Sequence, residues 1–319
     1  MERKGRKKME GETKQIIRTT VYTFFRNYHS FTSVVVLLAF PASASILLSQ
    51  PILPAFPDLF LSILSRIRLL LHAAGIPTSS EFSVAVNVKF AQIIFTYVLS
   101  LPFTITFLLL AKACVIAIVC RSSSSGLVSS SLGFYLSLLW TNLCGSFTIL
   151  TANAAVFSIL FIIFNIADLL LPIISPNFNL AVLTAGAVLY SLVISHVTVV
   201  CNLAVVITGV ENRGGFLQLL KAFLLVRRRP AIALTLTLFG SIAVASTEAL
   251  FYYRIMKPYR LIIPLVPSIL FEAVFIAYLR SIVVVLDVIA TCVFYNKFGS
   301  DKLPEFVEQS TATVGRNKI

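Results

Sequence analysis

The sequence predicts an all-α membrane protein, built as a polytopic bundle of six transmembrane helices with amphipathic helices at the membrane interface. Six long apolar stretches each reach the roughly 18–20 residues that a helix needs to cross about 30 Å of hydrocarbon. Hydrophobic residues make up 58% of the chain and charged residues 12%, whereas about 25% of residues in soluble domains are charged. The stretches are Phe31–Leu48, Val84–Cys120, Leu132–Leu171, Leu180–Val210, Ala231–Tyr253 and Leu261–Tyr295.

The N-terminal residues 1–30 form a basic segment that we expect to lie in the cytosol. Within it, Lys14–His29 predicts an amphipathic helix, because apolar side chains recur at helical spacing along one stripe. Such a helix suits the membrane interface, where aromatic rings insert and basic residues attract anionic lipid headgroups. The pattern also fits a plain lead-in to the first span. The stripe consists of Ile17, Val21, Phe24, Phe25 and Tyr28.

The connection between the first two spans contains a second amphipathic stretch. Pro51, Pro54 and Pro57 interrupt the helix after the first span, because proline lacks a backbone donor and clashes with the preceding turn. The following residues, Asp58–Ala74, carry apolar side chains along one side of a helix. They are too few and too charged to cross the membrane, so we expect a helix lying on the non-cytosolic surface.

The third apolar stretch, Leu132–Leu171, is long enough to hold two helices. As one helix it would extend about 60 Å, roughly twice the hydrocarbon thickness. A turn near Asn153 would split it and give seven spans, but no Pro or Gly pair marks a hairpin there. The sequence therefore favours six spans, with a third helix that either protrudes or is broken.

Lys and Arg are distributed unevenly between the two sides of the membrane. The N-terminal segment, the connections 121–131 and 211–230 and the tail after Tyr295 hold 18 of the 26, and the alternate connections hold six. Since short cytosolic loops accumulate Lys and Arg, both termini are placed in the cytosol. Splitting the third stretch would leave 12 on each side. The pattern predicts a multi-pass integral membrane protein and does not choose between endoplasmic reticulum and plasma membrane.

Five ionisable residues inside the predicted spans are the candidate functional residues, because each charge at mid-membrane costs about 2.5–3.5 kcal/mol. Glu272, Arg280 and Asp287 fall within one sector of about 80° on the last span. Lys112 and Glu248 are candidate partners on other spans. One hypothesis is an ion- or proton-coupled pathway with the acids as carriers. The other, which alternating signs on one face favour, is a set of helix-orienting ion pairs in which Arg280 and Lys112 neutralise two of the three acids. We expect Glu272 or Asp287 to be the partner of Arg280.

The connection after the fourth span carries a distinctive motif. It runs Glu211-Asn212-Arg213-Gly214-Gly215-Phe216, continues as an amphipathic helix over Gly214–Val226 and ends at Arg227-Arg228-Arg229-Pro230. With Tyr252-Tyr253-Arg254 and Lys257-Pro258-Tyr259-Arg260, it resembles a family of uncharacterised plant-type six-span integral membrane proteins. More remotely, it is similar to the membrane domain fused to some bacterial glycerophosphodiester phosphodiesterases. The resemblance implies a helical bundle of undefined role and brings no catalytic residue.

No enzyme motif stands out in the sequence. It holds no GxSxG, phosphate loop or metal-ligand spacing, and none of its five cysteines is at CxxC spacing, so no disulfide framework is expected. We predict no enzyme, cofactor, metal site or nucleic-acid partner.

The predicted domains are 1–30, the transmembrane domain 31–295 and a polar cytosolic tail 296–319. The predicted function is a non-enzymatic scaffold or accessory component that contacts the bilayer and other membrane proteins. The alternative is a small-solute or ion transporter using charged residues of the last spans.

Overall fold

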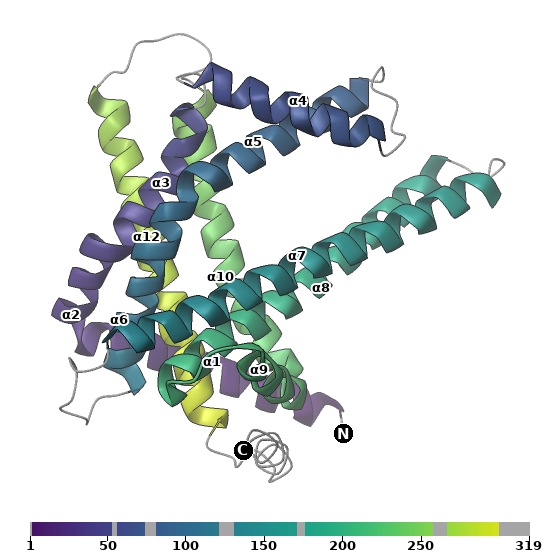
Figure 1. Ribbon diagram of the computed structural model, residues 1–319. Helices are drawn as coiled ribbons and strands as arrows, with labels where there is room; N and C mark the ends of the chain where they lie inside the picture. The colour runs from purple at the N-terminus through teal and green to yellow at the C-terminus, as the bar shows by residue number, and fades with distance from the viewer. Residues whose placement is uncertain are drawn as a thin grey trace, which may run out of the picture. The chain divides into compact units, whose positions relative to one another are not determined.

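The computed structural model is helical and has no strand among the residues it describes (Figure 1). Those residues are 2–52, 56–73, 81–120, 131–170, 176–257 and 267–299. Within them, six segments are long and apolar enough to cross a membrane, which confirms the predicted all-α bundle of six spans. The segments are Tyr28–Ser49, Phe90–Cys120, Gly133–Leu160, Thr184–Glu211, Pro230–Met256 and Ile269–Phe298. Most of the predicted tail, from residue 300 onward, lies outside the described residues.

Three of the six segments contain a single widened, π-helical turn. Pro41 follows the first of these turns and Pro102 precedes the second. Because proline cannot donate the regular helical hydrogen bond, a locally widened turn accommodates it within a continuous span. The first segment comprises α2 (Tyr28–Val34), η1 (Val35–Ala39) and α3 (Phe40–Ile52), the second α5 (Glu81–Phe103), η3 (Thr104–Leu108) and α6 (Leu109–Cys120), and the fifth α10 (Pro230–Phe251) and η4 (Tyr252–Met256).

All three predicted amphipathic segments are helical. Helix α4 (Pro57–Ala73) and helix α9 (Phe216–Arg228) begin and end within two residues of the predictions. Helix α1 (Glu2–Arg26) begins well before the predicted Lys14, because the Lys, Arg, Glu and Met residues at its start are themselves good helix formers. The apolar stripe of α1 is also divided: Phe24 is buried, whereas Val21, Phe25 and Tyr28 are exposed.

The third and fourth spans belong to two unbroken helices that run side by side, α7 (Ser131–Leu170) and α8 (Pro176–Glu211) (Figure 1). No turn occurs near Asn153. Instead, the Asn153 side-chain oxygen accepts a hydrogen bond of 2.7 Å from the Tyr190 hydroxyl on α8. The seven-span alternative is therefore wrong, since the residue at which it would break the helix holds the two helices together.

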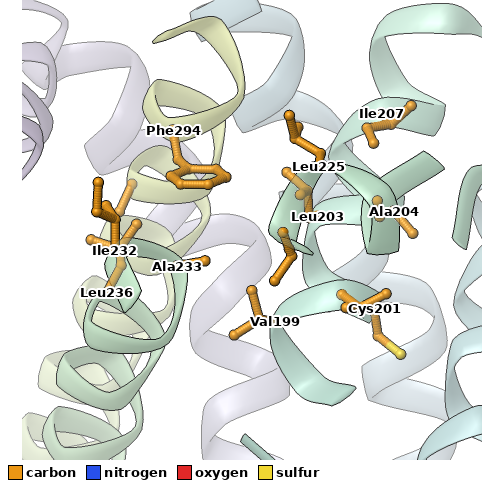
Figure 2. Packing of buried hydrophobic residues seen from close by; sticks show 14 of the residues in the cluster. Val199, Cys201, Leu203, Ala204, Ile207, Leu225, Ile232, Ala233, Leu236 and Phe294 are labelled. Atoms are coloured by element: carbon orange, nitrogen blue, oxygen red, sulfur yellow. The ribbon is translucent and has the colours of Figure 1, made fainter. Parts of the chain in front are cut away.

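The chain forms two compact units, and the first comprises Met1–Thr23, Ile116–Leu238 and Val288–Ile319. Its core lies where α8, α9, the beginning of α10 and the end of α12 (Pro267–Phe298) meet Ile16 of α1. Since lipid is as apolar as leucine, close van der Waals packing holds such a core within a membrane. Figure 2 shows its buried side chains, among them Val199, Cys201, Leu203, Ala204, Ile207, Leu225, Ile232, Ala233, Leu236 and Phe294.

The ends of several helices meet within this first unit. The Lys297 ammonium near the end of α12 donates a hydrogen bond of 2.8 Å to the Gln15 side chain on α1. Arg229, between α9 and α10, pairs with Glu12 of α1 at 3.7 Å and lies over the Phe298 ring. The N-terminal helix and the end of the last span therefore lie at the same end of the unit.

The second unit comprises Phe24–Val115 and Phe239–Asp287. Its core joins α3 with the end of α10, η4 and α12 through buried side chains such as Leu47, Phe251 and Ile276. Helix α4 packs beside α5. Its Ile67 is buried while Leu61 and Leu69 are exposed, so α4 buries one side and leaves leucine side chains exposed on another.

Candidate functional site: charged pairs between the fifth and sixth spans

Opposite charges on the fifth and sixth spans meet within the second unit. Arg254 of η4 pairs with Glu272 of α12, and Glu248 of α10 pairs with Arg280 of α12. From the first pair to the second, the residue number falls on the fifth span and rises on α12. The two helices are therefore antiparallel neighbours. The charges therefore fix which turn of one helix lies beside which turn of the other.

The Glu248–Arg280 pair is the more deeply placed of the two. The Arg280 Nη1 atom lies 2.5 Å from the Glu248 Oε1 atom, and the Arg280 side chain is 9% exposed against 50% for Glu248. A guanidinium group stays charged at any physiological pH, so burial leaves Arg280 dependent on a nearby anion. The Glu248 carboxylate supplies that anion, and the short charge-assisted hydrogen bond fixes its position.

The Arg254–Glu272 pair is the more exposed. Its Nη2 and Oε1 atoms are 3.0 Å apart, with 58% of the arginine side chain and 43% of the glutamate side chain exposed. Exposed ion pairs contribute about 0–1 kcal/mol. This pair therefore contributes to the alignment of the two helices more than to their stability.

Asp287 of α12 lies against the backbone of α10. A methyl group at Gly240 would collide with the Asp287 Oδ1 atom, so alanine at this position would require the Asp287 side chain to move. The charge of Lys112 acts on the Asp287 carboxylate. The second span thus contributes a positive charge to the surroundings of Asp287.

The expectation that Arg280 neutralises Glu272 or Asp287 is wrong. These acids lie about 10–12 Å from Arg280 along the same helix at 1.5 Å per residue, and direct contacts within a helix join residues three or four positions apart. The charges instead find partners across helices. The structure pairs Arg280 with Glu248, and the charge of Lys112 acts on Asp287.

Two residues of this site were not identified from the sequence. Arg254 lies just after the fifth apolar stretch, in a predicted connection, and Gly240 is one small residue within that stretch. Aligning the fifth and sixth spans as an antiparallel pair from Glu248 and Arg280 would have found both. That alignment places Arg254 opposite Glu272 and Gly240 opposite Asp287.

The motif after the fourth span forms a second polar cluster, in the first unit. Glu211 at the end of α8 accepts hydrogen bonds from Lys221 at 2.6 Å and from Gln218 at 3.2 Å. The Thr141 hydroxyl on α7 accepts one from the Gly215 amide at 3.0 Å and shares another with Thr208 at 2.9 Å. These bonds tie the start of α9 to α7 and α8.

The two glycines of this motif serve different purposes. Gly215 has a φ of 118°, a backbone conformation that side chains with a Cβ atom rarely adopt. At Gly214, a Cβ atom would collide with the backbone of Ser137 on α7. The acid, the glycine pair and the short helix are therefore explained by the geometry of a tight turn against α7.

The chemistry available at these sites is electrostatic. Among the described residues, no group of three or more His, Cys, Asp or Glu side chains could hold a metal ion. Both polar clusters pair acids with bases or hydroxyls with backbone groups, and every contact joins one helix to another. Such contacts orient helices within an apolar medium.

Comparison with known proteins places the chain in a family. Residues 11–297 match the family described as "Domain of unknown function (DUF8558)". No curated protein matches the chain, and no solved structure does. The matched residues include all six apolar segments, the charged pairs and the turn after the fourth span. The chain therefore belongs to the DUF8558 family.

Proposed function

We propose that the protein is a non-enzymatic membrane component that scaffolds or assists other membrane proteins. The observation that carries this proposal is the length of the apolar hairpin formed by α7 and α8. The hairpin is longer than a membrane can cover, so part of its surface needs a protein partner.

The length argument follows from helix geometry. Helix α7 has 40 residues and α8 has 36, which correspond to about 60 and 54 Å at 1.5 Å per residue. Membrane helices tilt by up to about 40°, and at that angle α7 still extends about 46 Å along the membrane normal. The hydrocarbon core is about 30 Å thick. About 15 Å of the hairpin therefore lies beyond it.

The surface of the hairpin is apolar and open. Only 6% of the most apolar part of Gly133–Leu160 is buried, compared with 17–56% of the corresponding parts of the other five spans. Exposed apolar surface outside the hydrocarbon marks protein–protein contacts, and aromatic residues are enriched in such contacts. Beyond Leu160, where the apolar segment of α7 ends, Ile162 and Ile163 are exposed, and Phe157 and Ile159 are exposed in the turn just before it.

The proposed orientation places both termini in the cytosol. The bias of Lys and Arg supports this side, and the contacts of α1 with the end of α12 support a shared side for the two ends. The connection from α8 to α9 then lies in the cytosol. The far end of the hairpin lies on the opposite side, where its partner must lie.

Anionic lipid headgroups are the second proposed partner, at α1 and α9. On α1, Lys14, Arg18 and Tyr22 are exposed while Ile16 on the other face is buried. On α9, Phe216, Leu220 and Phe223 form an exposed apolar stripe that ends near Arg227. Aromatic and basic side chains on one face favour the interface of a negatively charged leaflet.

The charged pairs favour a structural role over the alternative, a solute or ion transporter. A carrier carboxylate must bind and release its cargo, whereas Glu248 holds a buried arginine that cannot lose its charge. Glu272 is likewise paired with Arg254, and the charge of Lys112 acts on Asp287. Pairing of this kind favours helix orientation over solute movement.

The size of the native assembly tests the proposal. We expect the protein, extracted from its membrane in mild detergent, to have a protein mass larger than its 35.1 kDa chain once the bound detergent is subtracted. Changing Phe157, Ile159 and Ile162 together to Ala should release the smaller species. Changing Leu270, Phe271 and Phe275 of α12, which are exposed to a similar degree, should leave the assembly intact. An assembly that survives the hairpin changes, or a wild-type monomer, would contradict the proposal.

A further inference from the structure

Two cysteines from distant parts of the chain meet in the first unit. Cys120 is the last residue of α6, and Cys292 lies on α12. Their side chains are close enough to interact with each other. The Cys120 thiol also donates to the Asn296 side-chain oxygen at 3.7 Å, one turn beyond Cys292. Asn296 therefore helps to hold Cys120 beside α12.

The two thiols differ in their access to small molecules. Cys292 is fully buried, with no exposed surface, whereas Cys120 is partly exposed at the end of its helix. An accessible thiol beside a buried one is the arrangement in which the first reacts with an oxidant and the second resolves the product. Both cysteines are reduced in the structure.

We infer that Cys120 and Cys292 form a site of reversible oxidative modification, at which hydrogen peroxide links the second span to the sixth through a disulfide. The Cys120 thiolate attacks one peroxide oxygen, the O–O bond breaks, and the products are Cys120 sulfenic acid and hydroxide. The Cys292 sulfur then attacks the sulfenic sulfur, forming the S–S bond and releasing the second oxygen as hydroxide. Two protons from the thiols convert the two hydroxides to water. Two thiols are thereby oxidised and one peroxide is reduced to two waters.

The position of Cys120 suits this reaction. A disulfide requires Cα atoms about 4.4–6.8 Å apart and a defined torsion about the S–S bond. The contact of Cys120 with Asn296 places its sulfur one helical turn from Cys292 on α12. The inference is independent of the proposed scaffold role, since it concerns the closing of α6 onto α12 rather than the hairpin.

The test counts free thiols in the purified full-length protein. After treatment with hydrogen peroxide and removal of the oxidant, the denatured chain is labelled with a maleimide polymer that adds a fixed mass per thiol. The wild type has five cysteines, so we expect five labels before oxidation and three after it, with five restored by dithiothreitol. Digestion should yield one cross-linked peptide that contains Cys120 and Cys292.

Two variants identify the pair. Cys120→Ser should show four labels before and after oxidation, since only four of the five cysteines remain and none has its partner. Cys114→Ser, on the same helix, should fall from four labels to two. Five labels in the oxidised wild type, a loss of two labels in Cys120→Ser, or a cross-link between two chains would overturn the inference. The wild-type peptide map decides the question even if a variant does not fold.

Discussion

At the scale of single residues, the charges of the last two spans are explained by pairing across helices. Arg280 is buried and always charged, so it depends on Glu248 more than Glu248 depends on it. The Arg254–Glu272 pair joins the same two spans, but both of its side chains are exposed and its ion pair is weaker. The two pairs therefore predict different costs for what looks like the same substitution.

Replacing Arg280 by Leu should lower stability sharply, because it leaves Glu248 without a cation in an apolar medium. Breaking a buried pair costs about 3–5 kcal/mol, less here because Glu248 is half exposed. Adding Glu248→Gln should restore much of the folded yield, whereas adding Glu272→Gln or Asp287→Asn should not. Arg254→Leu is the matched control and should cost about 1 kcal/mol or less. Thermal unfolding in detergent measures each variant. Rescue by Glu272→Gln instead of Glu248→Gln would refute the pairing.

Replacing Gly240 by Ala should destabilise the protein, because the added methyl group collides with the Asp287 carboxylate. The direction of the change in stability is informative, since Gly→Ala inside an unobstructed helix stabilises a protein by about 1 kcal/mol. Gly133 of α7 provides the control, because a Cβ atom added there would have no neighbour within 4 Å. Gly133→Ala should be neutral or stabilising in the same unfolding experiment. A Gly240→Ala protein as stable as Gly133→Ala would show that the position of the Asp287 carboxylate against α10 does not contribute to stability.

At the scale of elements, the sequence predicted the helices better than their partners. Long apolar runs specify spans, because the hydrocarbon requires every backbone group to be satisfied within the helix. Periodicity likewise located α4 and α9. It could not say that α7 runs unbroken past Asn153, because the bond from Tyr190 that holds this point comes from another helix. The partner of Arg280 and the meeting of Cys120 with Cys292 were hidden for the same reason: both depend on which helices are neighbours.

The turn between α8 and α9 gives a prediction at this scale. Gly214→Ala should destabilise the first unit, because the collision is with the backbone of Ser137, which cannot rotate away as a side chain can. Thr141→Val tests the same turn without a collision. It removes the acceptor of the Gly215 amide and should cost about 1–3 kcal/mol. Both losses should appear as lower thermal stability in detergent. Unchanged stability in both variants would mean that the turn does not pack on α7.

At the scale of the whole molecule, six spans and the contact of α1 with the end of α12 are consistent with one another. An even number of crossings returns the chain to the side on which it began. The uneven distribution of Lys and Arg predicts that this side is the cytosol. The same orientation decides where the far end of the α7–α8 hairpin lies.

Tags before Met1 and after Ile319 test the orientation. In sealed microsomes the cytosolic face is outermost, so added protease should remove both tags. A tag inserted at residue 173, between the hairpin helices, should survive until detergent opens the vesicles. Protection of either terminal tag, or cleavage of the inserted tag in sealed vesicles, would contradict six spans with cytosolic ends.

Photo-crosslinking in living cells tests the scaffold proposal most directly. Phe157 on the hairpin and Phe239 on α10 are both 63% exposed, so replacing each in turn by benzoylphenylalanine probes two equally open surfaces. We expect the residue 157 probe to give a discrete protein adduct and the residue 239 probe to give lipid adducts alone. If both positions yield only lipid, the hairpin is covered by the bilayer and the scaffold proposal is wrong.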